Sequence, residues 1–353
     1  MHESDWVSAH VFYHENLDAL LTNAAGPLIA ELAGRGLAEA AFFLRYWDGG
    51  PHLRFRALPT GPAHRAEVER VLAERFEKYL AENPAGRSMS QRDYAGIGEA
   101  LAQWEGLPGH TERLFPNNSV AFIPYRREHD RYGTGASMEA VERHFAESSR
   151  IALGLLRDGL RPADRTTAGA AMILLTWFCG ERDAARLAPW VSIDQDRPGD
   201  IPEADRPGDV TEADRAGDVS EADRAGDVSE GGFTQPAARA TERRRERVIG
   251  LARGMRELAT HLEHVSGPGS LADWARSVST LRDALAAEAA AGRFEPPPRG
   301  WEGEGAVKTR QVLTVLDICA HLVCNRLGVT VQEEGAVRRL CADAVAVLAE
   351  EGR

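Results

Sequence analysis

The chain has 353 residues, a formal net charge of -12 at pH 7 and 43% hydrophobic residues, so it can bury a substantial core. No apolar run approaches the ~20 residues that a membrane helix needs, and residues 1–5 lack a signal-peptide pattern, which together predict a cytoplasmic protein. Eight Asp, four Glu and four Arg in residues 196–231 account for -8 of the charge and leave -4 for the rest. This balance argues weakly against unspecific nucleic-acid binding and leaves room for a local basic site.

The N-terminal part alternates between strand and helix patterns. Four segments with the alternation and residue types of strands lie at 6–14, 41–48, 52–58 and 119–125. Helical spacing begins after the predicted cap Asn16 and recurs at 62–82 and 98–104. The turn residues 49–51 predict a hairpin between the second and third strands. The order β-α-β-β-α-β is that of a ferredoxin-like split βαβ sheet.

The remainder of the chain has helical patterns. They lie at 138–158, 166–180, 241–266, 271–290, 309–327 and 334–351. The predicted fold class is therefore α+β, a ferredoxin-like sheet domain merged with a mostly helical C-terminal half. We place the α+β sheet part at 1–160, a helical segment at 161–190, an acidic insertion at 191–233 and a helical C-terminal part at 234–353.

The insertion contains a nine-residue repeat that begins at Asp196 and reads DRPGDIPEA, DRPGDVTEA, DRAGDVSEA and DRAGDVSEG. Calcium-binding nonapeptide repeats differ from it, because they carry paired glycines and no arginine in each unit. Each unit here has at most one bulky aliphatic residue, too little apolar area to offset the entropy of ordering. We expect a solvated, disordered insertion without a catalytic role.

The predicted hairpin carries the first candidate site. His52, Arg54 and Arg56 alternate along its second strand and share one face, and Arg45 lies in the partner strand. Several guanidiniums on one sheet face form a platform for anions, since each presents a planar fork to a carboxylate or phosphate. The alternative is an ordinary solvated sheet face.

The second candidate is the charged loop 124–133, which follows the last predicted strand and contains Arg131 and Tyr132. Functional residues often lie on such loops. The alternative is a salt-bridge network that only holds the loop.

The third candidate lies in the helix predicted at 309–327. His321 is four residues before Asn325 and four after Asp317, so the three share one helical face and Asp317 could orient the imidazole. The alternative is a satisfied core histidine. His321 and Asp317 alone are too few ligands for a metal.

Other chemistry has no recognisable motif in the sequence. A GxGxxG fingerprint with its acidic residue, a Walker A loop, GxSxG and HExxH do not occur. The four cysteines fit neither a CxxC pair nor a zinc knuckle, so we expect buried free thiols: Cys179, Cys319, Cys324 and Cys341.

Three segments in this order resemble the C-terminal elimination domain of lantibiotic dehydratases. FFLRYWDGGPHLRFR at 42–56 is similar to that domain's FFIRY-D-x-x-HIRLR hairpin. IPYRREHDRYGTG at 123–135, with ERHFAESS at 142–149, is similar to its RYGG and DS stretch, and HLVCNRL at 321–327 to its HMxxNRL helix. The likeness brackets residues 6 to about 345, and stand-alone copies are called thiopeptide-type bacteriocin biosynthesis proteins.

The resemblance implies action on a ribosomally made precursor peptide without a cofactor or metal. In one chemistry, a separate glutamyl-tRNA-dependent protein esterifies Ser or Thr with glutamate, and the elimination protein expels glutamate to leave dehydroalanine or dehydrobutyrine. In the other, a diverged copy joins two dehydroalanines into the pyridine of a thiopeptide and releases the leader peptide. We favour elimination, because removing a Cα proton builds negative charge that fixed cations stabilise.

Roles for individual residues follow from the same resemblance. Arg45 and Arg131 match arginines that contact glutamate and stabilise charge, and His321 matches the acid–base histidine. Candidate substrate-binding residues are Arg54, His52, Tyr132 and Asn325. The sequence departs from the family pattern at Thr134, where a glycine is expected, and at Ser148, where an acid is expected.

The expected partners are the precursor peptide and the glutamylating protein, with no direct contact to nucleic acid or membrane. A homodimer is a further expectation. The peptide is expected to dock as an added strand, at the first strand or an edge of the sheet, or through a groove. The sequence also leaves open a non-catalytic leader-binding scaffold and a peptide aminoacyl-tRNA ligase.

Overall fold

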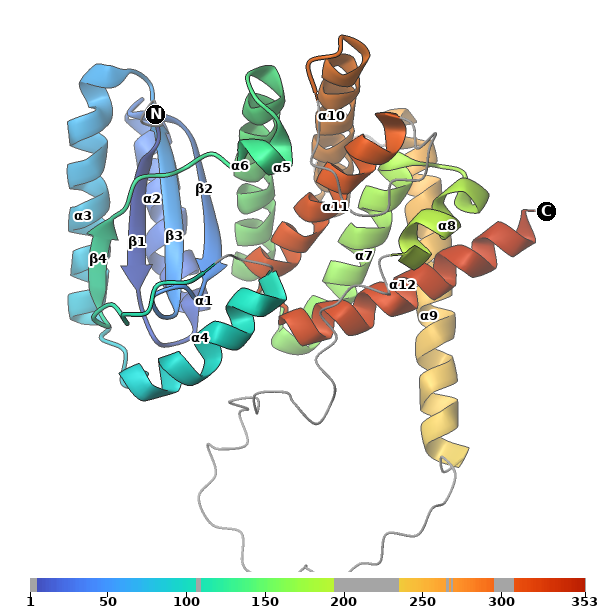
Figure 1. Ribbon diagram of the computed structural model, residues 1–353, viewed down its shortest axis with the longest axis horizontal. Coiled ribbons are helices and arrows are strands. Elements are labelled where there is room, and N and C mark those ends of the chain that lie inside the picture. The colour runs from blue at the N-terminus through green and yellow to red at the C-terminus, as the bar shows by residue number, and fades with distance from the viewer. Residues whose placement is uncertain are drawn as a thin grey trace, which may run out of the picture.

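The structure is a computed structural model that describes residues 5–105, 109–193, 235–264, 267, 269–294 and 308–352. The nonapeptide repeat lies outside the described residues. The described chain forms a four-stranded sheet with its helices, followed by a helical half, so the predicted α+β class is confirmed (Figure 1).

The sheet has the topology predicted from the order of its elements. Its strands are β1 (Val7–Phe12), β2 (Ala38–Tyr46), β3 (His52–Pro59) and β4 (Ser119–Phe122). They run antiparallel in the order β2-β3-β1-β4, which is the ferredoxin-like arrangement. β1 is thus an interior strand, and β2 and β4 are the two edges.

Helices cover one face of this sheet. After β1 come α1 (Leu17–Leu20), the π-helical turn η1 (Leu21–Ala25) and α2 (Gly26–Gly34), and after β3 come the 3-10 turn η2 (Pro62–His64) and α3 (Arg65–Glu82). Asn16 caps α1 as predicted, with its side chain accepting from the N–H of Asp18. α2 and α3 pack on the sheet, where Phe55 meets Phe76 edge-on at 5.3 Å (Figure 1).

A linking region joins the sheet to the helical half. It contains α4 (Gln91–Glu105), the short helix α5 (His129–Tyr132) and α6 (Ala136–Arg157). α4 begins well before the predicted 98–104, and α5 has too few residues to show a period. α6 runs along β2 and separates the sheet from the helices beyond (Figure 1).

The helical half is built around α7 (Pro162–Gly180), whose residues 169–179 are all buried. Around it lie α9 (Gln235–Thr260), α10 (Ser270–Ala290), α11 (Lys308–Leu327) and α12 (Val331–Glu351), with α8 (Ala184–Ile193) against α12 and η6 (Leu262–His264) after α9. All four cysteines are free and buried, as expected. None of the described helices combines the length and the apolar character needed to cross a membrane.

The start of α12 is fixed by a reciprocal cap. The Thr330 hydroxyl accepts from the N–H of Glu333 at 3.2 Å, and the Glu333 carboxylate accepts from the N–H of Thr330 at 2.8 Å. We expect Thr330→Ala to lower the free energy of unfolding by about 1 kcal/mol in urea denaturation, since it removes this cap. Thr167→Ala, at an exposed position inside α7, is the control and should cause no loss.

Candidate functional site

The side of the sheet opposite α2 and α3, which we call the cationic face, carries His10, His52, Arg54 and Arg56. β1 and β3 pair in a register that sets His10 opposite Arg54. Directly paired residues place their side chains on the same side, so the alternation predicted for β3 continues onto β1. The segment before and after β4 lies over this face, where Phe115 stacks on Phe12 with 4.4 Å between ring centroids.

The two histidines of the cationic face are neutral. His10 and His52 are stacked with ring centroids 4.9 Å apart. Burial, together with neighbouring positive charges, lowers the pKa of His10 to about 2, and burial lowers the pKa of His52 to about 3 despite the hydrogen bond of 2.8 Å between its Nδ1 and the Gly50 carbonyl. The positive charge of the face therefore belongs to its arginines.

The arginines of this face lie on aromatic rings. The Arg54 guanidinium is 3.4 Å from the ring centroid of Tyr46, and that of Arg56 is 4.1 Å from Tyr125. Arg56 is buried, and within the described part of the chain it has no ion pair and its Nε has no hydrogen-bond partner. Burial lowers its pKa to about 10, so it stays charged at neutral pH as a cation without a described ion pair, although the charge of nearby Glu128 acts in the opposite direction.

Arg45 lies on the opposite side of the sheet, contrary to the shared platform predicted for the hairpin. Its register partner is Leu53, a core residue of the helix-covered face. The Arg45 Nη2 is 2.6 Å from a carboxylate oxygen of Asp18, whose other oxygen accepts from Arg165. Arg45 is therefore a partner in a structural ion pair, away from the cationic face.

Asn325 holds β2 by its main chain. Its amide oxygen accepts from the Arg45 N–H at 3.0 Å, and its amide nitrogen donates to the Arg45 carbonyl at 2.9 Å. One residue on, the Arg326 Nε donates to the Phe43 carbonyl at 3.1 Å, and the Phe43 N–H donates to Ser149. These bonds close the outer edge of β2 and use both ends of the Asn325 amide, which was predicted to contact substrate.

Arg326 itself is a second buried cation. Its guanidinium donates to the Ser149 hydroxyl at 3.0 Å and to the Ser148 hydroxyl at 3.2 Å, and its Nη2 has no partner among the described residues. Ser148 is the position where the family pattern has an acid. Burial lowers the pKa of Arg326 to about 10, and the nearby charge of Arg56 acts in the same direction.

Arg131 and Tyr132 point to different surroundings, although they are adjacent in α5. Arg131 is half exposed, and within the described chain its ion pair is with Glu128 at 3.2 Å. Tyr132 is buried edge-on against Phe145 at 5.5 Å. No described hydrogen bond or ion pair joins Arg131 to Arg45 or His321, so the structure does not bring these three predicted catalytic residues into contact.

His321 pairs with an acid from the next helix. Its Nδ1 is 2.8 Å from Oε2 of Glu334, and the other carboxylate oxygen of Glu334, Oε1, accepts from Arg338 at 2.7 Å. Burial opposes ionisation of Glu334, but the charges of His321 and Arg338 outweigh it and lower the pKa of this carboxyl. Asp317, predicted to orient His321, accepts from Arg338 and Trp177.

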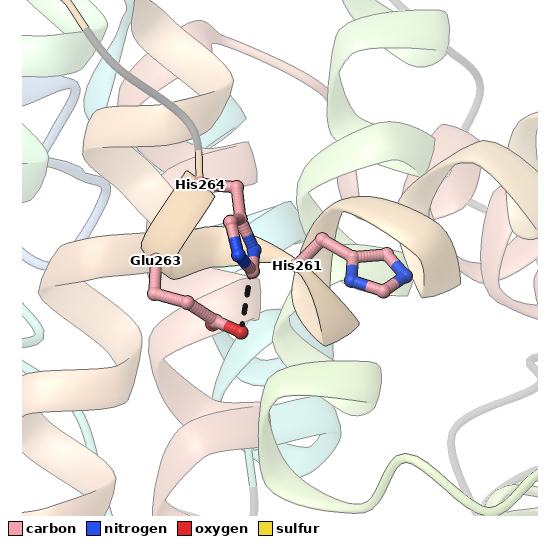
Figure 2. Close-up of side chains that lie close together, drawn as sticks. All are labelled: His261, Glu263 and His264. Carbon is pink, nitrogen blue, oxygen red and sulfur yellow. Dashed lines mark ion pairs between the residues drawn. The ribbon is translucent and has the colours of Figure 1, made fainter.

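One group of possible metal ligands lies outside these regions. Within the described ranges it comprises His261, Glu263 and His264, whose ligand atoms lie within 4.8 Å of one another (Figure 2). All three side chains are exposed at the end of α9, and the dashed contact between His264 and Glu263 is 3.5 Å long. We assign this group no role.

Sequence reasoning did not select His10 or Arg326, and it noted Arg56 only as part of the face. A signal for His10 was present, because Ser8 and His10 interrupt an otherwise apolar strand at alternating positions. Arg326 is recognisable as a buried cation only once α6, α11 and β2 are brought together.

A family model described as lantibiotic biosynthesis dehydratase, C-terminal, matches residues 6–345. The chain belongs to this family, and it is thereby a biosynthetic enzyme for ribosomally made peptide products. No curated protein matches the sequence.

Three solved structures share the fold. The pyridine synthase TbtD from thiomuracin biosynthesis is 19% identical, with a TM-score of 0.68 over 98% of this chain and 99% of that one. TsrL is 18% identical, with a TM-score of 0.59 over 98% and 95%. The tRNA-dependent lantibiotic dehydratase MibB from Microbispora sp. 107891 is 20% identical, with a TM-score of 0.54 over all of this chain and 29% of MibB.

Proposed function

We propose that the protein eliminates glutamate from glutamylated Ser or Thr residues of a precursor peptide, forming dehydroalanine or dehydrobutyrine. The observation that carries this proposal is the cationic face, where Arg56 is buried beside Arg54 without an ion pair among the described residues. A buried charge of this kind is costly unless a ligand compensates it. The departing glutamate supplies such an anion.

The chemistry of elimination suits fixed cations. Loss of the Cα proton builds enolate charge, and that charge passes to the carboxylate that departs. Guanidiniums held in place before the reaction stabilise both without having to reorganise. Arg54 and Arg56 provide these charges, and neutral His52 lines the same face.

We propose different roles for the other predicted site residues. The family resemblance supports two further roles. We propose that Arg131 of α5 contacts the anion and that His321 of α11 is an acid–base group. Arg45 and Asn325 are proposed to position the hairpin, because each is bound to other parts of the fold. A separate glutamylating protein would supply the substrate, and both would act in the cytoplasm.

Mass spectrometry of a glutamylated precursor peptide incubated with the purified protein tests this function. We expect glutamyl adducts to disappear, dehydrated residues to replace them, and free glutamate to appear in equal amount. Adducts that persist unchanged, in a protein that remains folded by circular dichroism, would contradict the proposal.

A second candidate is pyridine formation, favoured by the likeness to TbtD over nearly the whole of both chains. It predicts that a peptide already containing dehydroalanines loses its leader and gains a pyridine. Leader binding without turnover of either peptide would instead indicate a scaffold. The two substrates, tested in parallel, separate these functions.

A further inference from the structure

His10 differs from the other buried histidines in its hydrogen bonding. Only 6% of its surface is exposed, yet no described residue hydrogen-bonds to its ring. His52 and His144 are also buried, and each bonds through Nδ1 at 2.8 Å, to the Gly50 carbonyl and the Ser277 hydroxyl respectively, while the Nε2 of each is buried without a described partner. Neither ring nitrogen of His10 is among these buried, unpartnered atoms, so the ring is buried while its nitrogens stay accessible to solvent or to a ligand.

The place of His10 indicates which ligand this would be. It lies opposite Arg54 in the register of β1 and β3, and its ring stacks on His52 at an interplanar angle of 19°. The charges of Arg54 and Arg56 are close enough to disfavour its protonation. An anion bound to these guanidiniums would therefore lie against the imidazole of His10.

The surroundings keep His10 in the state that can accept a proton. Burial, and after it the positive charges of the neighbouring Arg54 and Arg56, lower its pKa to about 2. The polar and charged groups that face this part of the sheet are His52, Arg54 and Arg56 from β3, Tyr46 from β2, Asp48 from the hairpin turn, and Tyr125, Glu128 and Tyr132 from the segment after β4. A bound carboxylate would offset part of the arginine charge and raise the proton affinity of the ring.

We propose that His10 is a catalytic acid–base residue of the elimination, an inference that rests on the proposed function. The Cα–H bond breaks and its proton passes to the His10 imidazole. The electron pair forms the Cα=Cβ bond, the Cβ–O bond breaks, and glutamate leaves as a carboxylate beside Arg54 and Arg56. The imidazolium is then stabilised by the departing anion and returns its proton to solvent when glutamate diffuses away.

His10→Asn tests this role, because an amide keeps the polarity of the site but cannot take up a proton. We expect kcat for glutamate release to fall about 10²–10⁴-fold with little change in KM, and the acid limb of the pH–rate profile to disappear. His10→Ala should regain part of its activity when imidazole is added, whereas a merely structural role would show no such rescue. His264→Asn, an exposed histidine far along the chain, is the matched control and should match the wild type.

A second measurement reports on His10 without turnover. With histidine-labelled protein, the NMR signals of the His10 ring should indicate a neutral ring from pH 5 to 8, and added glutamate should shift its titration upward into that range. The proposal is overturned if His10→Asn releases glutamate at the wild-type rate with an unchanged pH profile, a result that leaves the proposed function intact. A wild-type protein that releases no glutamate contradicts the proposed function instead, and a ring insensitive to glutamate contradicts the anion contact of His10.

Discussion

Arg56→Gln should lower the rate of glutamate release about 10²–10³-fold, the usual effect of removing one fixed donor that stabilises developing charge. The melting temperature should stay the same or rise, because the substitution removes a buried charge that has no described carboxylate partner. Steady-state release of glutamate and thermal unfolding, measured on the same preparation, check both parts.

The opposite signs of these two effects make the test for Arg56 specific. Arg157→Gln, at an exposed position at the end of α6, is the matched control and should change neither quantity. If Arg56→Gln lowered activity only in proportion to a loss of folded protein, Arg56 would be a structural residue, and the cationic face would lose its role in binding glutamate.

Asp18→Asn should destabilise the fold by about 2–4 kcal/mol, because it leaves Arg45 and Arg165 without their shared carboxylate. The value is set below that of a fully buried pair, since 22% of the Asp18 side chain is exposed to solvent. Urea denaturation at pH 7 measures the loss. Asp343→Asn, an exposed acid on α12, should have almost no effect.

The same substitution should change how stability depends on pH. Burial raises the pKa of Asp18, but hydrogen bonds and charges from Arg165 and Arg45 outweigh it and hold the pKa below its ordinary value of 3.8. As the pH falls, the Asp18 carboxyl therefore takes up a proton in the unfolded chain before it does so in the folded protein. The contribution of Asp18 to the free energy of unfolding is complete above pH 3.8 and is lost as the pH falls through the folded-state pKa. An Asp18→Asn protein that lost stability at the same rate below about pH 4 as the wild type would show that other acids dominate there.

The sequence predicts the elements of the sheet well but not how the hairpin strands face each other. Alternation within β3 correctly groups His52, Arg54 and Arg56, because side chains alternate within any strand. The side taken by Arg45 depends on the register across the turn, where a shift of one residue would reverse it. The turn observed here pairs Arg45 with Leu53, and no local pattern in the sequence determines that choice.

Contacts between distant segments account for most of what the sequence could not predict in the candidate site. His321 has an acid four residues before it in the same helix, yet its Nδ1 contacts Glu334 of α12. The packing of α11 against α12, rather than the spacing along one helix, determines this partner. Likewise, the sequence shows that position 148 has a serine where the family pattern has an acid. Only the fold shows that this serine lies against the guanidinium of Arg326, which therefore has no carboxylate at that position.

The side chains that bind the main chain of Phe43 and Arg45 close the β2 edge of the sheet, so among the described strands β4 is the other edge at which a further strand could add. If the substrate adds to the sheet as a strand, β1 is enclosed between β3 and β4, and the substrate would pair with β4, where Phe122 is 38% exposed. The peptide would then extend from β4 toward the arginines of β3. The number of residues between the part paired with β4 and the modified side chain would decide which serines and threonines are processed.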